Sequence, residues 1–252
     1  VYKRQNKEIE KARISDLISL IPNECQDAVL DIGTRDGWFS ILLAEKFAKV
    51  TALDLEKPSI DHPAIECVKG DAQKLDFPDA SYDLISCAEV LEHIPSDRLA
   101  KVCSELERVT KQYILIGVPY KQDIRVGRTT CYTCGKRNPP WGHVNSFDEY
   151  RLKRLFSSCD VKKMSFVGEN NEYTNRLAML LMDFAGNPFG TYCQEEVCVH
   201  CGARLKQPPK RNILQRISTR LAFYINNIQQ FFYSPHPNWI HILFEKRKAQ
   251  RT

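Results

Sequence analysis

The apolar positions of the chain fall into short runs separated by turns and helical patterns. Residues 7–21 place apolar side chains at helical spacing, and that pattern ends at Pro22. Five apolar runs of strand length follow, at 28–32, 50–53, 65–68, 82–86 and 113–118. Helices are expected at 38–47 and 96–109, the second with Ser96 as its N-terminal cap. Short apolar strands separated by helices predict a parallel sheet that is covered on both faces.

The regular alternation breaks after residue 118. Residues 119–145 are rich in Pro, Gly and Cys and predict a loop insertion. A helix is then expected at 147–156, starting near Ser146 or Asp148, followed by a sixth strand at 161–167 and a last strand at 239–244. The chain is predicted to divide into six segments. They are an N-terminal helix (1–26), a core (27–118), a first insertion (119–145), a core helix and strand (146–167), a second insertion (168–237), and a last strand with a basic tail (238–252).

Polar residues follow the predicted strands in a pattern typical of a nucleotide-like ligand. The first strand runs into Gly33-Thr34-Arg35-Asp36-Gly37 and then a helix. Gly33 permits a tight turn, and ligands of such sheets lie outside the carboxyl ends of the strands. Asp54 ends the second strand, where its carboxylate can accept from both hydroxyls of a ribose. Asp71 follows the third strand, within reach of an adenine amino group, and the fourth strand ends in the polar segment 88–94.

Taken together, these segments resemble class I S-adenosylmethionine-dependent methyltransferases, most nearly the small-molecule and lipid-type enzymes with a Leu-Glu-His segment. The likeness rests on the motifs at 29–37, 54, 70–71, 77–85 and 90–93, and it extends through Gly142, His143 and Phe147. It implies an α/β, Rossmann-like sheet of seven mostly parallel strands with helices on both faces and an antiparallel last strand. Arg35 stands where the family usually has a third glycine. The Gly-x-Gly-x-x-Gly spacing of nicotinamide enzymes is absent.

The resemblance also implies which residues form the site. It implies that Asp31, Gly33 and Gly37 hold the methionine end, Asp54 the ribose, and Asp71 with Ala72 the adenine. Thr34, Leu55 and Glu89 are further expected cofactor-binding residues. Methyl transfer mainly requires alignment of acceptor, methyl group and sulfur, and a hydroxyl acceptor also benefits from a general base. His93 and His143 are the candidate catalytic bases. The alternative for each histidine is a packing or loop-capping role.

Four of the ten cysteines form two Cys-x-x-Cys-Gly segments, at 131–135 and 198–202. Tetrahedral Zn²⁺ binds four thiolates, and each such segment offers two of them from one small loop. Cys131, Cys134, Cys198 and Cys201 are therefore predicted to form a structural zinc site, closed to chemistry. Both segments follow strands that end at the carboxyl edge of the sheet. We expect the zinc to join the two insertions into a lid, or into one wall of an acceptor pocket.

The amino-acid composition indicates the class of protein and the compartment in which it folds. With 43% hydrophobic and 27% charged residues, the chain is typical of a soluble globular protein, and no apolar run reaches the ~18 residues of a membrane span. Five further cysteines are scattered in apolar segments, which favours a reducing, cytoplasmic location. The chain begins at Val1, and residues 1–5 are interpreted as a candidate non-native start. An upstream targeting signal therefore stays open.

The net charge of +5 is unevenly distributed. Residues 1–120 carry 15 Lys and Arg against 21 Asp and Glu, whereas residues 121–252 carry 21 against 10. A basic half favours an anionic partner, with plain solubility as the alternative. Residues 210–233 place apolar side chains at helical spacing beside Arg211, Arg216 and Arg220. Two interpretations stay open: a helix packed on the domain, or a helix lying on an anionic membrane to reach a lipid-linked acceptor.

Three functions compete on these patterns. The leading hypothesis is a cytoplasmic methyltransferase that methylates a small-molecule, lipid-linked or glycan-linked acceptor at oxygen. If residues 210–233 bind a membrane, this enzyme would be peripheral to it. The second is an RNA or protein methyltransferase, which the zinc segments and the basic half favour. Against it, the chain has no motif of the known RNA-reading modules, and the fourth strand lacks an Asn-Pro-Pro-Tyr-like end. The third is a zinc-containing binding module that keeps the cofactor fold without catalysis.

Overall fold

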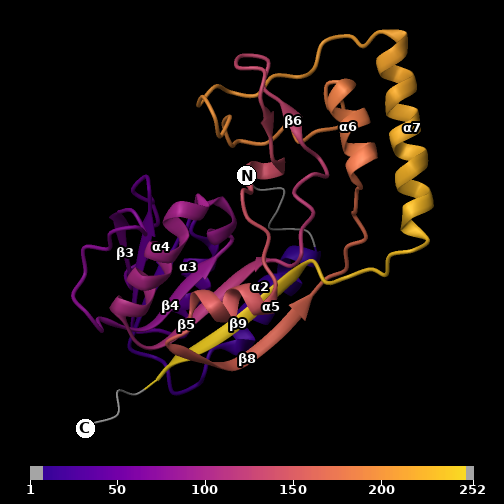
Figure 1. Cartoon of the computed structure of the whole chain (residues 1–252). Helices are drawn as coiled ribbons and strands as arrows, with labels where there is room; N and C mark the ends of the chain where they lie inside the picture. The colour runs from indigo at the N-terminus through magenta and orange to yellow at the C-terminus, as the bar shows by residue number, and fades with distance from the viewer. Residues whose placement is uncertain (1–7, 248–252) are drawn as a thin grey trace. The chain divides into compact units, whose positions relative to one another are not determined.

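A computed structural model describes residues 8–247 of the chain (Figure 1). The described residues form two compact units: unit 1 comprises 8–120, 147–168 and 237–247, and unit 2 comprises 121–146 and 169–236. Each unit is considered by itself below. The candidate non-native start at 1–5 and the end of the basic tail at 248–252 lie outside the described residues.

Unit 1 is built on a seven-stranded sheet with the order β3-β2-β1-β4-β5-β9-β8. The strands are β1 Ala28–Ile32, β2 Lys49–Asp54, β3 Ile65–Lys69, β4 Tyr82–Ala88, β5 Thr110–Pro119, β8 Cys159–Val167 and β9 Trp239–Lys246. Only β9 is antiparallel to its neighbours in this sheet, pairing with β5 on one side and β8 on the other. The predicted fold class and its antiparallel last strand are confirmed.

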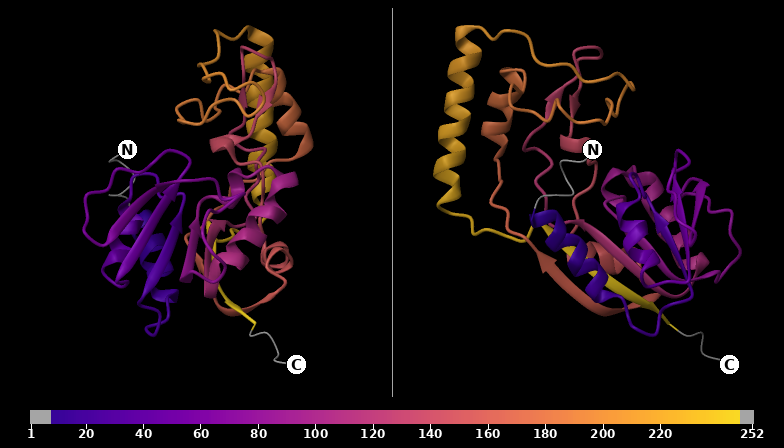
Figure 2. Two further views of the ribbon diagram at one scale, coloured as in Figure 1. Left: turned by 90° about the vertical axis from the view of Figure 1, so that its left-hand side faces the viewer. Right: turned by 180° about the vertical axis from the view of Figure 1, so that it is seen from behind.

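Helices cover both faces of this sheet, as the two views of Figure 2 show. On one face, α2 (Glu8–Leu20) and α3 (Trp38–Ala44) pack their leucines against β1, β2, β4 and β5. On the other face, α4 (Ser96–Val109) and α5 (Glu149–Leu155) pack against β4, β5 and β9. Because both faces are covered, the central strands are apolar at successive positions rather than at alternate ones.

The starts of two helices differ in how they are capped. The predicted capping role of Ser96 is wrong: Ser96 is the first residue of α4, Pro95 occupies the cap position, and no side chain caps that end. Proline can stand there because its fixed φ suits the entry to a helix and the missing N–H would have no helical partner. At α5, the Asp148 side chain accepts a hydrogen bond from the backbone N–H of Arg151. Asp148, not Ser146, therefore caps this helix.

Unit 2 contains a short hairpin and two longer helices. The hairpin pairs β6 (Thr129–Thr130) with β7 (Arg137–Asn138), and the helices are α6 (Arg176–Phe184) and α7 (Ile213–Gln230). The helix expected within 210–233 is thus present, and a reciprocal capping box of Asn212 and Gln215 fixes its start. The hairpin and α6 were not predicted. None of the described helices is long and apolar enough to cross a bilayer.

Candidate functional site

The carboxyl ends of β1, β2, β3 and β4 lie side by side along one edge of the sheet in unit 1. Ile32 of β1 is in register with Leu53 of β2 and Cys87 of β4, and Leu53 is in register with Val68 of β3. The parallel register therefore brings the segments that follow each strand to a common edge. This is the position at which doubly wound sheets bind ligands.

The turn after β1 has three residues in the left-handed region. Gly33 and Gly37 have φ values of 77° and 75°, and Arg35, with its exposed side chain, has a φ of 49°. A Cβ atom on Gly33 would lie 2.3 Å from Cγ2 of Val90, so that position requires glycine for space as well as for conformation. The turn therefore carries an exposed side chain at Arg35, the position where the family usually has a third glycine.

Asp54 is held at the end of β2 by two backbone donors. Its Oδ2 accepts from the N–H of Arg35 at 2.8 Å, and its Oδ1 accepts from the N–H of Leu55 at 2.7 Å. Each oxygen keeps a further lone pair, so the carboxylate can still accept from a ligand hydroxyl. Leu55 is 65% exposed and offers an apolar surface beside it.

Asp31 and Thr34 are buried within the turn. Oγ of Ser40 donates to Oδ2 of Asp31 at 2.6 Å. Burial raises the pKa of Asp31 to about 7, and the bond from Ser40 partly opposes that rise. The Thr34 hydroxyl is buried and has no hydrogen-bond partner among the described residues. Since buried hydroxyls normally find a partner, this one fits a site that a polar ligand completes.

The acids beyond β3 and β4 are placed differently from each other. Asp71 is exposed, and its carboxylate accepts from the backbone and side-chain amides of Gln73, while the adjacent Ala72 is buried. Glu89 has a φ of 59°, a left-handed conformation that is strained for a side chain of its size, and its N–H donates to the Gly117 carbonyl at 2.8 Å. Strain of this kind concentrates at functional sites.

A buried acid precedes the first candidate base. Both residues lie in the 3₁₀ helix η1 (Leu91–His93) that follows β4. His93 is half-buried, whereas Glu92 is fully buried, and that burial, with Glu89 nearby, raises the pKa of Glu92 well above its ordinary value. Sequence reasoning named His93 and passed over Glu92, because burial of a single acid leaves no trace in spacing.

The second candidate base belongs to unit 2. His143 follows the 3₁₀ helix η2 (Pro140–Gly142) and is buried, with Nδ1 2.6 Å from Oε1 of Gln122. An amide oxygen only accepts, so Nδ1 carries the proton in this bond. His93 and His143 lie in different units, and their roles stay predictions.

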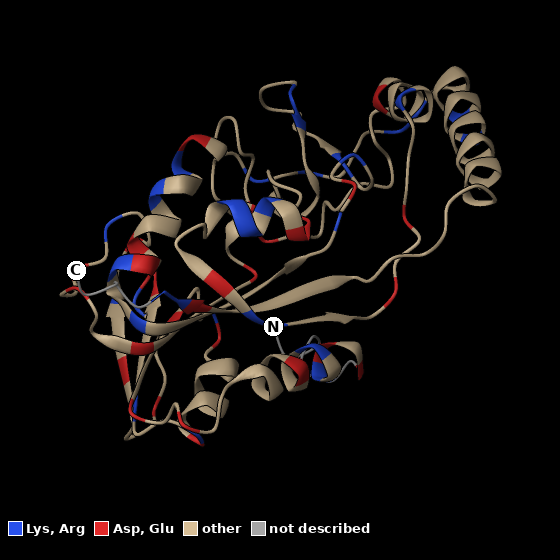
Figure 3. Cartoon of the chain, turned by 60° about the horizontal axis from the view of Figure 1, so that its bottom comes forward, with Lys and Arg blue, Asp and Glu red and all other residues tan. Residues whose placement is uncertain are grey.

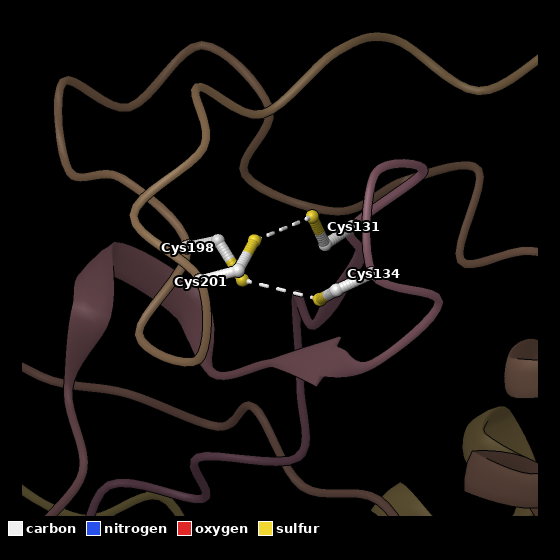
Figure 4. A group of neighbouring side chains, drawn as sticks. All are labelled: Cys131, Cys134, Cys198 and Cys201. Atoms are coloured by element: carbon white, nitrogen blue, oxygen red, sulfur yellow. Dashed lines mark hydrogen bonds between the residues drawn. The ribbon is translucent and has the colours of Figure 1, made fainter.

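The four predicted zinc-binding cysteines lie together in unit 2 (Figure 4). Their sulfur atoms are all within 4.8 Å of one another. The two Cys-x-x-Cys-Gly segments fold alike: Gly135 N–H donates to the Cys131 carbonyl, and Gly202 N–H donates to the Cys198 carbonyl. Both glycines are left-handed, with φ values of 74° and 69°.

The geometry of this cluster fits a metal. Sulfur atoms of Cys131 and Cys201 are 3.8 Å apart, and those of Cys134 and Cys198 are 3.7 Å apart. A tetrahedron with metal–sulfur bonds of about 2.3 Å has edges of about 3.8 Å, whereas a disulfide would bring two sulfurs to about 2 Å. Backbone N–H groups of Cys134 and then Thr133 lower the pKa of Cys131, whereas burial and bonds with the other three thiols raise the pKa of Cys201.

Unit 2 also holds a cavity of about 380 Å³, which the sequence did not predict. Its wall is partly aromatic and thioether and partly charged or amide: Trp141, Phe189, Phe223, Met179, Met182, Arg125, Arg128 and Asn226. Asp123 neutralises Arg125 through bonds of 2.7 and 2.8 Å, and Asp183 lies 3.4 Å from Arg128. Such a lining suits an apolar ligand that carries a few polar groups.

Known proteins are similar to part of unit 1. Residues 30–114 match the family described as "Methyltransferase domain". The chain contains a class I S-adenosylmethionine-dependent methyltransferase domain. The matched residues begin within β1 and end within β5, and they include the glycine turn, Asp54 and Asp71.

Two curated proteins are similar to part of this chain. The bifunctional biotin biosynthesis protein BioHC of Cellvibrio japonicus is 33% identical over 110 residues, 41% of this chain and 22% of that protein. A ubiquinone biosynthesis O-methyltransferase of Idiomarina loihiensis is 31% identical over 88 residues, 31% of this chain and 36% of that protein. The chain thus spans well under half the length of these curated relatives.

The fold likeness extends further than the sequence likeness. The N-methyltransferase NodS of Bradyrhizobium japonicum, solved with S-adenosylhomocysteine, superposes with a TM-score of 0.56 at 13% identity, covering 98% of this chain and 92% of that one. At this identity the likeness concerns the fold alone, since one fold supports many activities.

Proposed function

We propose that this chain binds S-adenosylmethionine at the edge formed by β1 to β4 and transfers its methyl group to a small-molecule acceptor. One observation carries the proposal: the glycine turn, the Asp54 carboxylate and the orphaned Thr34 hydroxyl lie at one edge of the sheet. The ubiquinone-pathway relative and NodS are both named as methyltransferases, which supports the same chemistry here.

Each residue of this edge has a physical task in the proposal. S-adenosylmethionine, when bound, supplies a methyl group on a sulfonium. Asp54 accepts from the ribose hydroxyls through the lone pairs that its backbone donors leave open, and Leu55 covers an adenine face. Asp71 accepts from the adenine amino group. Asp31 supports the turn from beneath, since it is buried, and Thr34 contacts the methionine end together with Gly33, Gly37 and Glu89.

For the acceptor, we propose a hydroxyl group on a small, lipid-linked or glycan-linked molecule. The lining of the unit 2 cavity includes three aromatic and two thioether side chains, which suit the apolar part of such a molecule. His93 and His143 remain the candidate general bases. His143 fits this task because the bond from its Nδ1 to Gln122 fixes the position of the ring.

For the cysteine cluster, we propose a structural zinc ion held by Cys131, Cys134, Cys198 and Cys201. The sulfur–sulfur distances and the two matching knuckles support it. Four thiolates fill the coordination sphere of zinc and leave no open position for catalysis. The ion would join two segments, 131–135 and 198–202, that are distant in sequence.

Calorimetric titration with S-adenosylhomocysteine tests the cofactor site directly. The full chain should bind it, and Asp54→Ala should weaken binding by at least about tenfold, the value of one or two charge-assisted hydrogen bonds. Asp160→Ala, which removes an exposed carboxyl of β8, is the matched control and should bind like the unchanged chain. Absence of binding would support a non-catalytic module instead.

Transfer of a labelled methyl group to lipid, glycan, RNA and protein fractions then identifies the acceptor class. In the active fraction, His93→Ala should lower turnover by about 10²-fold or more, as loss of a general base does, with unchanged affinity for S-adenosylhomocysteine. An unchanged turnover number removes His93 from the mechanism.

A further inference from the structure

Helix α7 buries small and polar side chains and exposes its large apolar ones. Its buried residues are small or polar: Ser218, Thr219 and Ala222. The large apolar side chains recur at spacings of three and four residues, which places them on one face, and that face is exposed: Ile213, Ile217, Leu221, Tyr224 and Ile228, with Leu214 beside it. A helix that merely packs on its own domain would bury this stripe.

Polar contacts hold the other face of α7 in place. Oγ of Ser218 donates to the Leu181 carbonyl of α6 at 2.9 Å. Asn175, which caps α6, donates from Nδ2 to Oε1 of Gln229 at 2.6 Å. Figures 1 and 2 show the two helices side by side. Hydrogen bonds and small residues make this contact, and the side chains of the α7 stripe stay 45% to 74% exposed.

Further large apolar side chains are exposed on α6 and just after α7. On α6, Leu177, Leu180 and Phe184 are each more than half exposed. At the end of α7, Phe231 and Phe232 are 90% and 81% exposed. We call these side chains, with the α7 stripe, the α6–α7 apolar surface. Monomeric proteins rarely expose so many large apolar residues without a partner for them.

The charge of the segment that contains α7 points to an anionic partner. From Val197 to Phe244 the sequence contains no Asp or Glu, whereas it contains six basic residues, namely Arg204, Lys206, Lys210, Arg211, Arg216 and Arg220. Arg216 and Arg220 lie on α7 itself, next to the stripe in the helical repeat, and Figure 3 shows no acidic residue along this helix.

We infer that the α6–α7 apolar surface docks on the interface of an anionic lipid bilayer. An in-plane helix needs an apolar face for the acyl boundary, basic residues at the level of the headgroups, and low overall hydrophobicity. α7 has all three, and no described helix could span the membrane instead. Exposed apolar rings such as Phe231 and Phe232 suit the boundary between headgroups and acyl chains. Docking of this kind would give the proposed methyltransferase access to a lipid-linked acceptor, although the surface itself is tested without reference to activity.

Vesicle co-sedimentation of the full chain tests this inference. Binding is expected to vesicles of phosphatidylcholine with about one third phosphatidylglycerol, and to be weaker on phosphatidylcholine alone, by about fivefold for each arginine engaged. Ile217→Gln with Leu221→Gln should reduce binding to the anionic vesicles by at least about tenfold, because two apolar side chains no longer enter the interface. Both positions are about half exposed, so the fold should survive.

The matched control is Met164→Gln, which removes one exposed apolar side chain from β8 in unit 1 and should bind vesicles normally. Arg216→Gln with Arg220→Gln should remove the preference for anionic vesicles. Far-ultraviolet circular dichroism checks that each variant is folded. Absence of vesicle binding by the unchanged chain overturns the inference. So does a dimer in solution that the Ile217→Gln and Leu221→Gln changes dissociate, since the surface would then be an interface between two copies.

Discussion

The backbone N–H of Arg35 donates a hydrogen bond to Oδ2 of Asp54, with 2.8 Å between the two atoms. This bond joins the turn after β1 to the acid that ends β2, so the two parts of the candidate cofactor site hold each other in place. The bond requires the left-handed backbone of Arg35, whose φ is 49°. The family's glycine preference at this position concerns the backbone, and an exposed arginine side chain can take its place.

Two substitutions at Arg35 separate the backbone from the side chain. Arg35→Gly keeps the N–H donor and adopts positive φ without strain, so affinity for S-adenosylhomocysteine should stay within about twofold of the original value. Arg35→Pro removes the donor and fixes φ near −65°, so affinity should fall by at least about tenfold. Titration calorimetry measures both. If Arg35→Pro bound as tightly as Arg35→Gly, the bond to Asp54 would have no part in ligand binding.

Much of the core of unit 1 could be predicted from the sequence because its strands are short and almost wholly apolar. The run Val29-Leu30-Asp31-Ile32 is buried throughout, and such runs mark parallel strands wherever they occur. The cysteine cluster was also predictable, since two Cys-x-x-Cys-Gly segments are rare by chance and four thiolates suit one metal. In both cases a local pattern determines the structure.

Other features depend on contacts between distant segments and leave no local pattern. The stripe of α7 was visible as spacing, but spacing does not say which face another element covers. Here the polar face, with Ser218, is the covered one. The start of α4 shows a smaller failure of the same kind: Ser96 is a good capping residue, yet Pro95 takes the cap position. The cavity of unit 2 joins residues 122 to 226 and could not be predicted from any one segment.

Removal of the metal should destabilise unit 2 selectively. We expect about one zinc ion per chain in protein purified without chelator, measured by elemental analysis. Cys134→Ser and Cys201→Ser replace exposed thiols of the cluster, so little packing is lost with them. Each should abolish stoichiometric zinc and lower the melting temperature of unit 2 by several degrees or more, because metal binding supplies folding free energy.

Cys193→Ser is the control for this pair. Cys193 is also an exposed free thiol of unit 2, and it does not belong to the cluster. The change should leave both the zinc content and the melting temperature unaltered. Less than half a zinc ion per chain in the unchanged protein would contradict a structural zinc site.

The buried carboxyl of Asp31 should make the stability of unit 1 depend on pH. Its folded-state pKa is about 7, raised from an ordinary value of 3.8 mainly by burial. Between these two values the folded state binds the proton more tightly than the unfolded state, so the free energy of unfolding falls as pH rises. Asp31→Asn cannot titrate and lacks this loss. Between pH 5 and pH 8 its stability relative to the original chain should therefore increase by roughly 2–3 kcal/mol. Urea unfolding at both pH values measures the difference.

Ser40→Ala provides the matched variant. The Ser40 hydroxyl donates to Asp31 and lowers the pKa of that carboxyl, so its removal should raise the pKa further. The free energy of unfolding should then fall more with rising pH than in the original chain. An identical stability difference between Asp31→Asn and the original chain at both pH values would mean that Asp31 ionises as an ordinary carboxyl.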